Sequence, residues 1–111
     1  MMQLKVKALK KIDIVTVSGR MDSATAPEFD NALKGLQLEG RHKIVLDFAG
    51  LDYMSSAGLR AMVAALKEAK AHNGSVLVAA ANDKIRDTIA LVGFQSLFPV
   101  FDDILEAVDS L

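Results

Sequence analysis

Two short apolar segments separated by one long amphipathic segment constrain the fold of this chain more than any other feature. Residues 43–48 and 75–80 are almost continuously apolar, which is typical of strands buried on both faces. Between them, from Ala57 to about Ala71, apolar residues recur at helical spacing, and Asn73-Gly74 follows. Because a helical crossover joins the two strands, we predict that they are parallel strands of a right-handed β-α-β unit.

The segment before this unit predicts a hairpin. Residues 3–8 alternate apolar with charged side chains, as a strand with one wet face does, and residues 12–18 are rich in β-branched side chains. The short polar gap between them favours an antiparallel pair whose first strand lies at the sheet edge. We expect Gly19 to end the second strand and residues 20–24 to form a loop.

A helix is predicted to follow that loop. Thr25 and Glu28 have the spacing of a capping box, and Pro27 falls in the first turn, where proline is tolerated. The apolar stripe of this helix runs to about Leu38.

Polar residues mark the starts of two short helices near the C-terminus. Asn82 or Asp83 is predicted to cap the first, with Gly93 as its left-handed stop. Asp102 or Asp103 is predicted to cap the second.

Residues 97–101 predict a short strand between these helices, and Pro99 indicates that it lies at a sheet edge. The elements therefore follow the order ββαβαβαβα, which indicates an α/β fold with a small mixed sheet. At 111 residues the chain can close one core, so residues 1–111 are predicted to form a single domain. Such sheets meet ligands and partners beyond the carboxyl ends of their parallel strands, here at residues 52–58.

Composition excludes several classes of function. The 13 basic and 14 acidic residues form no blocks of one sign, so a direct nucleic-acid partner is not expected. No apolar run reaches the roughly 18 residues of a membrane span, the N-terminus lacks the apolar centre of a signal peptide, and cysteine is absent, so we expect a cytoplasmic protein. Neither a metal nor a cofactor is expected, because the aspartates at 13, 22, 47 and 52 fall on different elements without ligand spacing.

Two hydroxyl groups stand at the corner between the 43–48 strand and the long helix. Ser55 and Ser56 lie where the helix begins, and a helix N-terminus offers unpaired N–H groups and the positive end of the helix dipole. One interpretation is capping alone, since serine is a favoured cap. The other is a switch, because the same dipole would stabilise a phosphate placed there. The spacing alone leaves both open.

The whole chain resembles a STAS domain, and more narrowly the bacterial anti-sigma factor antagonists. The resemblance is carried by the order of elements, the turn Gly19-Arg20-Met21-Asp22 and the corner Tyr53-Met54-Ser55-Ser56-Ala57-Gly58-Leu59. It implies that an anti-sigma factor serine/threonine kinase binds this protein and phosphorylates the corner serine, and that a serine phosphatase removes the phosphate. The unphosphorylated protein would sequester the anti-sigma factor and so free sigma to direct transcription.

The family's corner usually reads Asp-Ser-(Ser/Thr/Ala)-Gly-Leu, and the serine after the aspartate accepts the phosphate. Ser56 matches that serine, and Ser55, which stands in place of the aspartate, is the alternative acceptor. An unmodified Ser56 is expected to cap the helix, while Gly58 is expected to let a partner approach closely. The implied partner-binding residues are Asp22, Met54, Ser55, Ser56, Ala57, Gly58 and Leu59.

An enzyme is not expected. A serine hydrolase requires a Gly-x-Ser-x-Gly elbow and a histidine base within reach. This corner lacks the first glycine, and His42 and His72 are predicted to be exposed polar residues at the opposite end. Phosphate-loop motifs are also absent, although some STAS domains are thought to bind nucleotides. The alternative function is a STAS module of another signalling or lipid-transport complex, with nucleotide binding left open.

Overall fold

The predicted order of elements is confirmed by the computed structural model, which describes residues 2–91 and 97–111. The elements are β1 (Met2–Ala8), β2 (Asp13–Met21), α1 (Ala26–Leu38), β3 (Lys43–Met54), α2 (Ser56–Ala71), β4 (Ser75–Ala79), α3 (Asp83–Leu91), β5 (Val100–Phe101) and α4 (Ile104–Asp109). The predicted stop at Gly93 lies outside the described residues.

The strands form one mixed sheet in the order β1-β2-β3-β4-β5. β1 and β2 are antiparallel, which confirms the predicted hairpin, and the other neighbouring pairs are parallel. β5 occupies an edge of the sheet, as Pro99 indicated. The predicted α/β class and mixed sheet are therefore confirmed.

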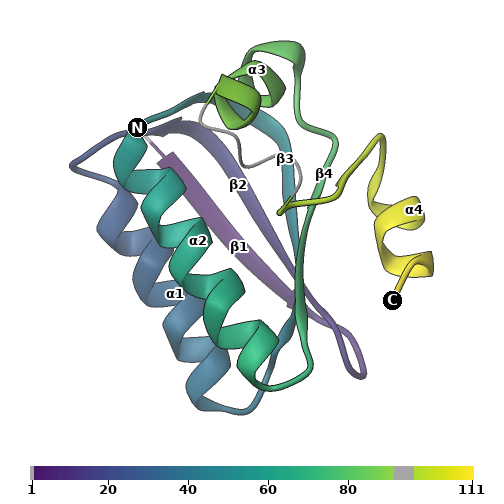
Figure 1. The fold of residues 1–111 in the computed structure, drawn as a ribbon. Helices are drawn as coiled ribbons and strands as arrows, with labels where there is room; N and C mark the ends of the chain where they lie inside the picture. The colour runs from purple at the N-terminus through teal and green to yellow at the C-terminus, as the bar shows by residue number, and fades with distance from the viewer. Residues whose placement is uncertain (1, 92–96) are drawn as a thin grey trace.

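Helices α1 and α2 lie side by side on one face of the sheet, and α4 covers part of the other face (Figure 1). Alternate residues of β3 pack on the two faces of the sheet. Ile44, Leu46 and Phe48 belong to the main core under α1 and α2, whereas Val45 packs in a smaller cluster with Ala107 of α4. This arrangement confirms that the 43–48 segment is buried on both faces.

Strands β2 and β3 extend further than predicted. Gly19 does not end β2. It adopts a φ of 90° at a register irregularity, and the strand continues to Met21. β3 likewise continues to Met54, because the extension of β2 supplies it with a pairing partner. The predicted ends depended on Gly19 and on the end of the apolar run, whereas the pairing of the two strands continues beyond both points.

The capping box at α1 is not formed. Thr25 is the N-cap residue, but its backbone is helical and its side chain makes no capping hydrogen bond. Thr25 Oγ1 instead accepts from the Asp22 N–H at 2.9 Å and donates to Arg20 O at 3.0 Å. The predicted caps of the later helices are confirmed for Asn82, which accepts from Ile85 N–H, and for Asp103, which accepts from Glu106 N–H.

None of the helices in residues 2–91 and 97–111 combines the length and the apolar character that crossing a bilayer requires.

Candidate functional site at the strand-to-helix corner

The corner is built where the carboxyl ends of β2 and β3 meet the start of α2. β3 ends at Met54 and α2 begins at Ser56. The backbone N–H of Ser55, between them, donates to Met21 O at 2.8 Å, which joins the corner to the last residue of β2. Asp22 follows Met21 directly, so the loop carboxylate and the two serines lie at the same end of the sheet.

The two serines occupy different environments. Ser55 is the N-cap residue, with an extended backbone, but its side chain makes no capping hydrogen bond. Its Oγ is buried and finds no partner among the described residues. Ser56 is the first residue of α2 and is exposed. The prediction that Ser56 caps the helix is therefore wrong, and Ser56 is the more accessible of the two.

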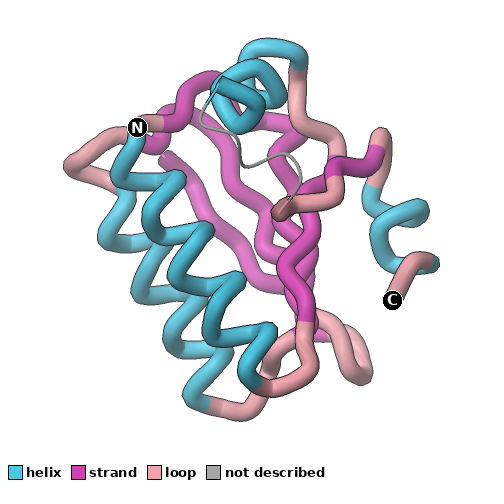
Figure 2. Tube along the Cα trace, viewed as in Figure 1, coloured by secondary structure: helices cyan, strands magenta, loops and turns pink. Residues whose placement is uncertain are grey.

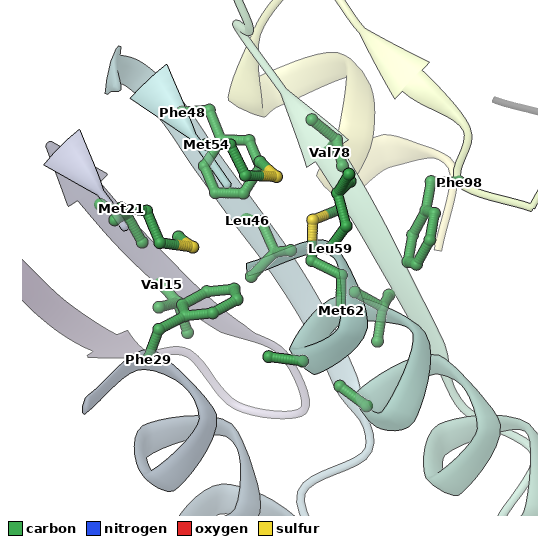
Figure 3. Packing of buried hydrophobic residues seen from close by; sticks show 14 of the residues in the cluster. Val15, Met21, Phe29, Leu46, Phe48, Met54, Leu59, Met62, Val78 and Phe98 are labelled. Atoms are coloured by element: carbon green, nitrogen blue, oxygen red, sulfur yellow. The ribbon is translucent and has the colours of Figure 1, made fainter. Parts of the chain in front are cut away.

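Three of the implied partner-binding residues face the protein interior. Met54 and Leu59 are 3% and 4% exposed, and Figure 3 shows both among the core side chains. Gly58 is also buried, and a Cβ added to it would lie 2.4 Å from Met21 Sδ. The missing side chain of Gly58 thus serves internal packing rather than the close approach of a partner. Leu59 belongs to the apolar stripe of α2, whereas Met54 is the last residue of β3.

The surface beside Ser56 is a shallow hollow of about 360 Å³ between α1 and α2. Ala57 is the one implied partner-binding residue that lines it. The other lining residues are Ser23, Ala26, Pro27, Asp30, Lys34, Arg60, Ala61 and Ala64. Small side chains predominate along it, so a partner could approach the two helices closely.

A cationic cluster near the corner escaped prediction. The guanidinium of Arg20 stacks on the Tyr53 ring at 4.2 Å, and Lys84 Nζ lies 5.8 Å from the centre of the same ring. Arg20 and Tyr53 are paired in the β2-β3 register, whereas Lys84 belongs to α3. Cation-π contacts of this kind hold charged side chains in place. Only the register of the two extended strands could have revealed the pair.

Asp22 organises the loop beside the corner. Its carboxylate accepts from the N–H groups of Ala24 and Thr25 at 3.0 and 3.1 Å, and Arg20 Nε lies 4.0 Å from its second oxygen. The backbone N–H of Thr25 is the main reason that the pKa of the Asp22 carboxyl lies below its usual value of 3.8. The loop thus holds a negative charge at neutral pH.

The lowered pKa of Asp22 predicts a pH-dependent contribution to stability. Because the folded-state pKa lies below the unfolded one, the carboxylate stabilises the fold above the unfolded value and ceases to do so as pH falls through the folded value. We expect the free energy of unfolding of Asp22→Ala to fall short of wild type at about pH 7, and the difference to shrink below about pH 4. Urea titrations across this range measure it, with Asp22→Asn as the uncharged control. A difference that stays constant with pH would contradict the assignment.

The remaining aspartates considered as metal ligands have separate roles. Asp13 pairs with Arg41, Asp47 accepts from Thr16 Oγ1, and Asp52 is exposed. Among the described residues, no three His, Asp or Glu side chains converge in the way that a metal site requires.

The two histidines lie at the far end of α2 from Ser56. α2 is 16 residues long, which at about 1.5 Å per residue separates its ends by roughly 24 Å. His72 is exposed, as predicted, but His42 is half-buried because its ring stacks on that of His72. Neither histidine reaches Ser56 to act as a base.

The STAS domain family model matches residues 3–107. The chain belongs to the STAS domain family. BtrV of Bordetella bronchiseptica, which carries a provisional name as an anti-sigma factor antagonist, is 30% identical over 99 residues, covering 89% of this chain and 85% of BtrV.

Solved structures show the same fold. The crystal structure of a Thermotoga maritima protein, also provisionally named an anti-sigma factor antagonist, has a TM-score of 0.91 at 19% identity and covers 96% of this STAS domain and 92% of that chain. The Bacillus cell fate determinant SpoIIAA in its phosphorylated form has a TM-score of 0.76 at 17% identity, covering 99% and 98% of the two chains.

Proposed function

We propose that this STAS domain is an anti-sigma factor antagonist that acts by partner switching. It binds a serine-kinase anti-sigma factor, loses that binding when the kinase phosphorylates Ser56, and regains it when a phosphatase removes the phosphate. The observation that carries the proposal is the exposed hydroxyl of Ser56 on the first residue of α2. Similarity to BtrV supports the antagonist assignment. Such a circuit operates in the cytoplasm, where ATP and the transcription machinery are found.

The position of Ser56 suits a reversible charge. A phosphoserine brings about −1.5 to −2 charges, and the unpaired N–H groups of the first helical turn favour an anion there. Because the side chain is exposed, the phosphate can stay hydrated and no core residue has to move. Modification at this site would therefore change the surface while leaving the fold intact.

Phosphorylation of Ser56 would change partner binding along the hollow between α1 and α2. A partner seated over Ala57 and Arg60 would cover the start of α2, and Ser56 with it. A dianion buried by that partner would have to be matched by a cation or lose its hydration at a large cost. The Asp22 carboxylate also lies at this end of the sheet, but Arg20 is 4.0 Å from it, so the size of the mismatch depends on the charges of the partner.

Ser55 remains the alternative acceptor, but its environment opposes the reaction. Its Oγ is buried and the residue is half-buried at the N-cap. A kinase would have to expose this hydroxyl before transfer, whereas Ser56 needs no such opening.

Phosphate transfer by the cognate kinase tests the proposal. With the kinase and ATP, we expect wild type and Ser55→Ala to accept one phosphate and Ser56→Ala to accept none, because Ser56 is the exposed one of the two corner serines. Intact-protein mass spectrometry followed by fragment mapping reads the result. A phosphate found on Ser56→Ala would show that Ser56 is not the acceptor. A loss of transfer confined to Ser55→Ala would show that Ser55 is the acceptor.

A further inference from the structure

A second cavity lies at the opposite end of the domain from the corner. Three turns meet there, those joining β1 to β2, α1 to β3 and α2 to β4, and Figure 2 shows these turns gathered at the lower end of the molecule. They enclose about 260 Å³. The lining residues are Lys10, Lys11, Gly40, Arg41, His42, Lys43, His72, Asn73 and Gly74.

The lining is strongly cationic in a chain whose net charge is −1. Four of the nine lining residues are Lys or Arg, and neither Asp nor Glu is among them. Arg41 is neutralised by Asp13, which is 1% exposed and lies 2.7 Å from Arg41 Nε. Within the described residues, Lys10, Lys11 and Lys43 form no ion pair. Asp13 beside Arg41 and Glu68, whose Oε1 lies 3.3 Å from His72 Nδ1, supply counter-charges, so the unpaired positive charge around the cavity is that of Lys10, Lys11 and Lys43.

Arg41 also fixes the position of the turn that carries two of these lysines. Its guanidinium donates to the carbonyl oxygens of Leu9 at 2.8 Å and Lys10 at 3.2 Å. Because Asp13 anchors the guanidinium from the buried side, the 9–12 turn is held against the start of β3. The rim of the cavity is therefore organised before any ligand arrives, which lowers the entropy cost of binding.

The two histidines of the chain form one wall. Their rings stack at 4.1 Å and are 5° from parallel. His72 Nδ1 lies 3.0 Å from Glu68 O, whereas His42 Nδ1 is buried without a partner among the described residues. Gly74 makes the stack possible, since a Cβ there would lie 2.0 Å from His42 O. Because this nitrogen is buried, it does not face a ligand in the cavity, and the stacked rings serve as a wall.

We propose that this cavity binds a small oligophosphate anion. Unpaired lysines are phosphate ligands, and their mutual repulsion would be relieved by a multivalent anion. The cavity, of about 260 Å³, is large enough for pyrophosphate and lies below the roughly 300–1,000 Å³ of pockets that hold drug-sized molecules. The site is separate from Ser56 and does not depend on the proposed antagonist function.

Titration of the full chain with pyrophosphate, followed by amide chemical shifts at constant ionic strength, tests the site. We expect saturable shifts confined to the three turns, and at least about tenfold weaker binding by the double variant Lys10→Gln/Lys43→Gln. Lys5→Gln/Lys67→Gln removes the same charge from exposed residues outside the cavity and should bind within about twofold of wild type.

Three outcomes of the pyrophosphate titration would overturn the proposal. They are the absence of saturation in wild type up to about 10 mM pyrophosphate, equal weakening by the two double variants, and shifts spread over the whole surface. Citrate, which is highly charged but carries carboxylates instead of phosphoryl groups, should bind more weakly, and equal binding of citrate would reject the oligophosphate class. As a second readout, the thermal midpoint of wild type should rise with pyrophosphate more than that of Lys10→Gln/Lys43→Gln.

Discussion

Ser56→Asp is expected to weaken binding to the cognate serine-kinase anti-sigma factor by about 100-fold, or about 2.7 kcal/mol. The carboxylate places a fixed negative charge on the exposed first residue of α2, beside the hollow lined by Ala57 and Arg60. A charge covered by a partner without a matching cation costs several kcal/mol. The same substitution should shift the thermal midpoint by less than about 3 °C, since the site is exposed and an acidic residue is favourable in the first turn.

Calorimetry of the complex and a thermal unfolding scan measure the two quantities. Ser56→Asn is the matched control, because asparagine has nearly the size of aspartate without its charge, and it should retain most of the affinity. Equal affinity of Ser56→Asp and wild type would remove the charge switch. A large fall in the thermal midpoint of Ser56→Asp would show instead that the residue has a structural role.

Gly74→Ala is expected to destabilise the fold by about 3 kcal/mol, which corresponds to a fall of roughly 10–20 °C in the thermal midpoint. A Cβ at Gly74 would lie 2.0 Å from His42 O, and backbone cannot give way as a flexible side chain can. The starts of β3 and β4 would have to separate. That movement would strain the hydrogen bond from Ser75 N–H to His42 O, now 2.9 Å, and the stacked imidazoles beside it.

Gly35→Ala is a control in which the same substitution is expected to raise the free energy of unfolding. Gly35 lies inside α1, and a Cβ there meets nothing within 4 Å. Replacing a glycine inside a helix by alanine stabilises it by about 0.5–1 kcal/mol, because alanine loses less backbone entropy. Urea unfolding of both variants measures the contrast. A Gly74→Ala variant as stable as wild type would mean that the two turns are not packed as described.

Side-chain periodicity carried most of the fold prediction. The alternating 3–8 segment, the apolar 43–48 and 75–80 segments and the helical spacing between them all correspond to observed elements. These patterns are reliable because a strand or helix presents its residues to the core at a fixed period. Asn82 and Asp103 were predictable for a similar reason, since each caps through a bond to a residue three positions ahead.

The failures occurred where a partner outside the motif itself decides the outcome. β2 continues past Gly19 because β3 pairs with it, and Thr25 does not cap α1 because Asp22 and Arg20 occupy its hydroxyl. Neither a glycine nor a capping-box motif indicates these other contacts.

The candidate site also has some features that the sequence predicted and others that only the tertiary structure decided. The corner and its serines could be located from sequence, because a strand followed by a helix must turn there whatever surrounds it. Which serine is accessible, and the burial of Met54, were decided only by the packing of β2 and the helices against that corner. The cationic cavity likewise exists only because three turns far apart in the chain meet at one end. Local periodicity is a property of neighbouring residues, whereas exposure and convergence depend on which distant surfaces the folded chain brings into contact.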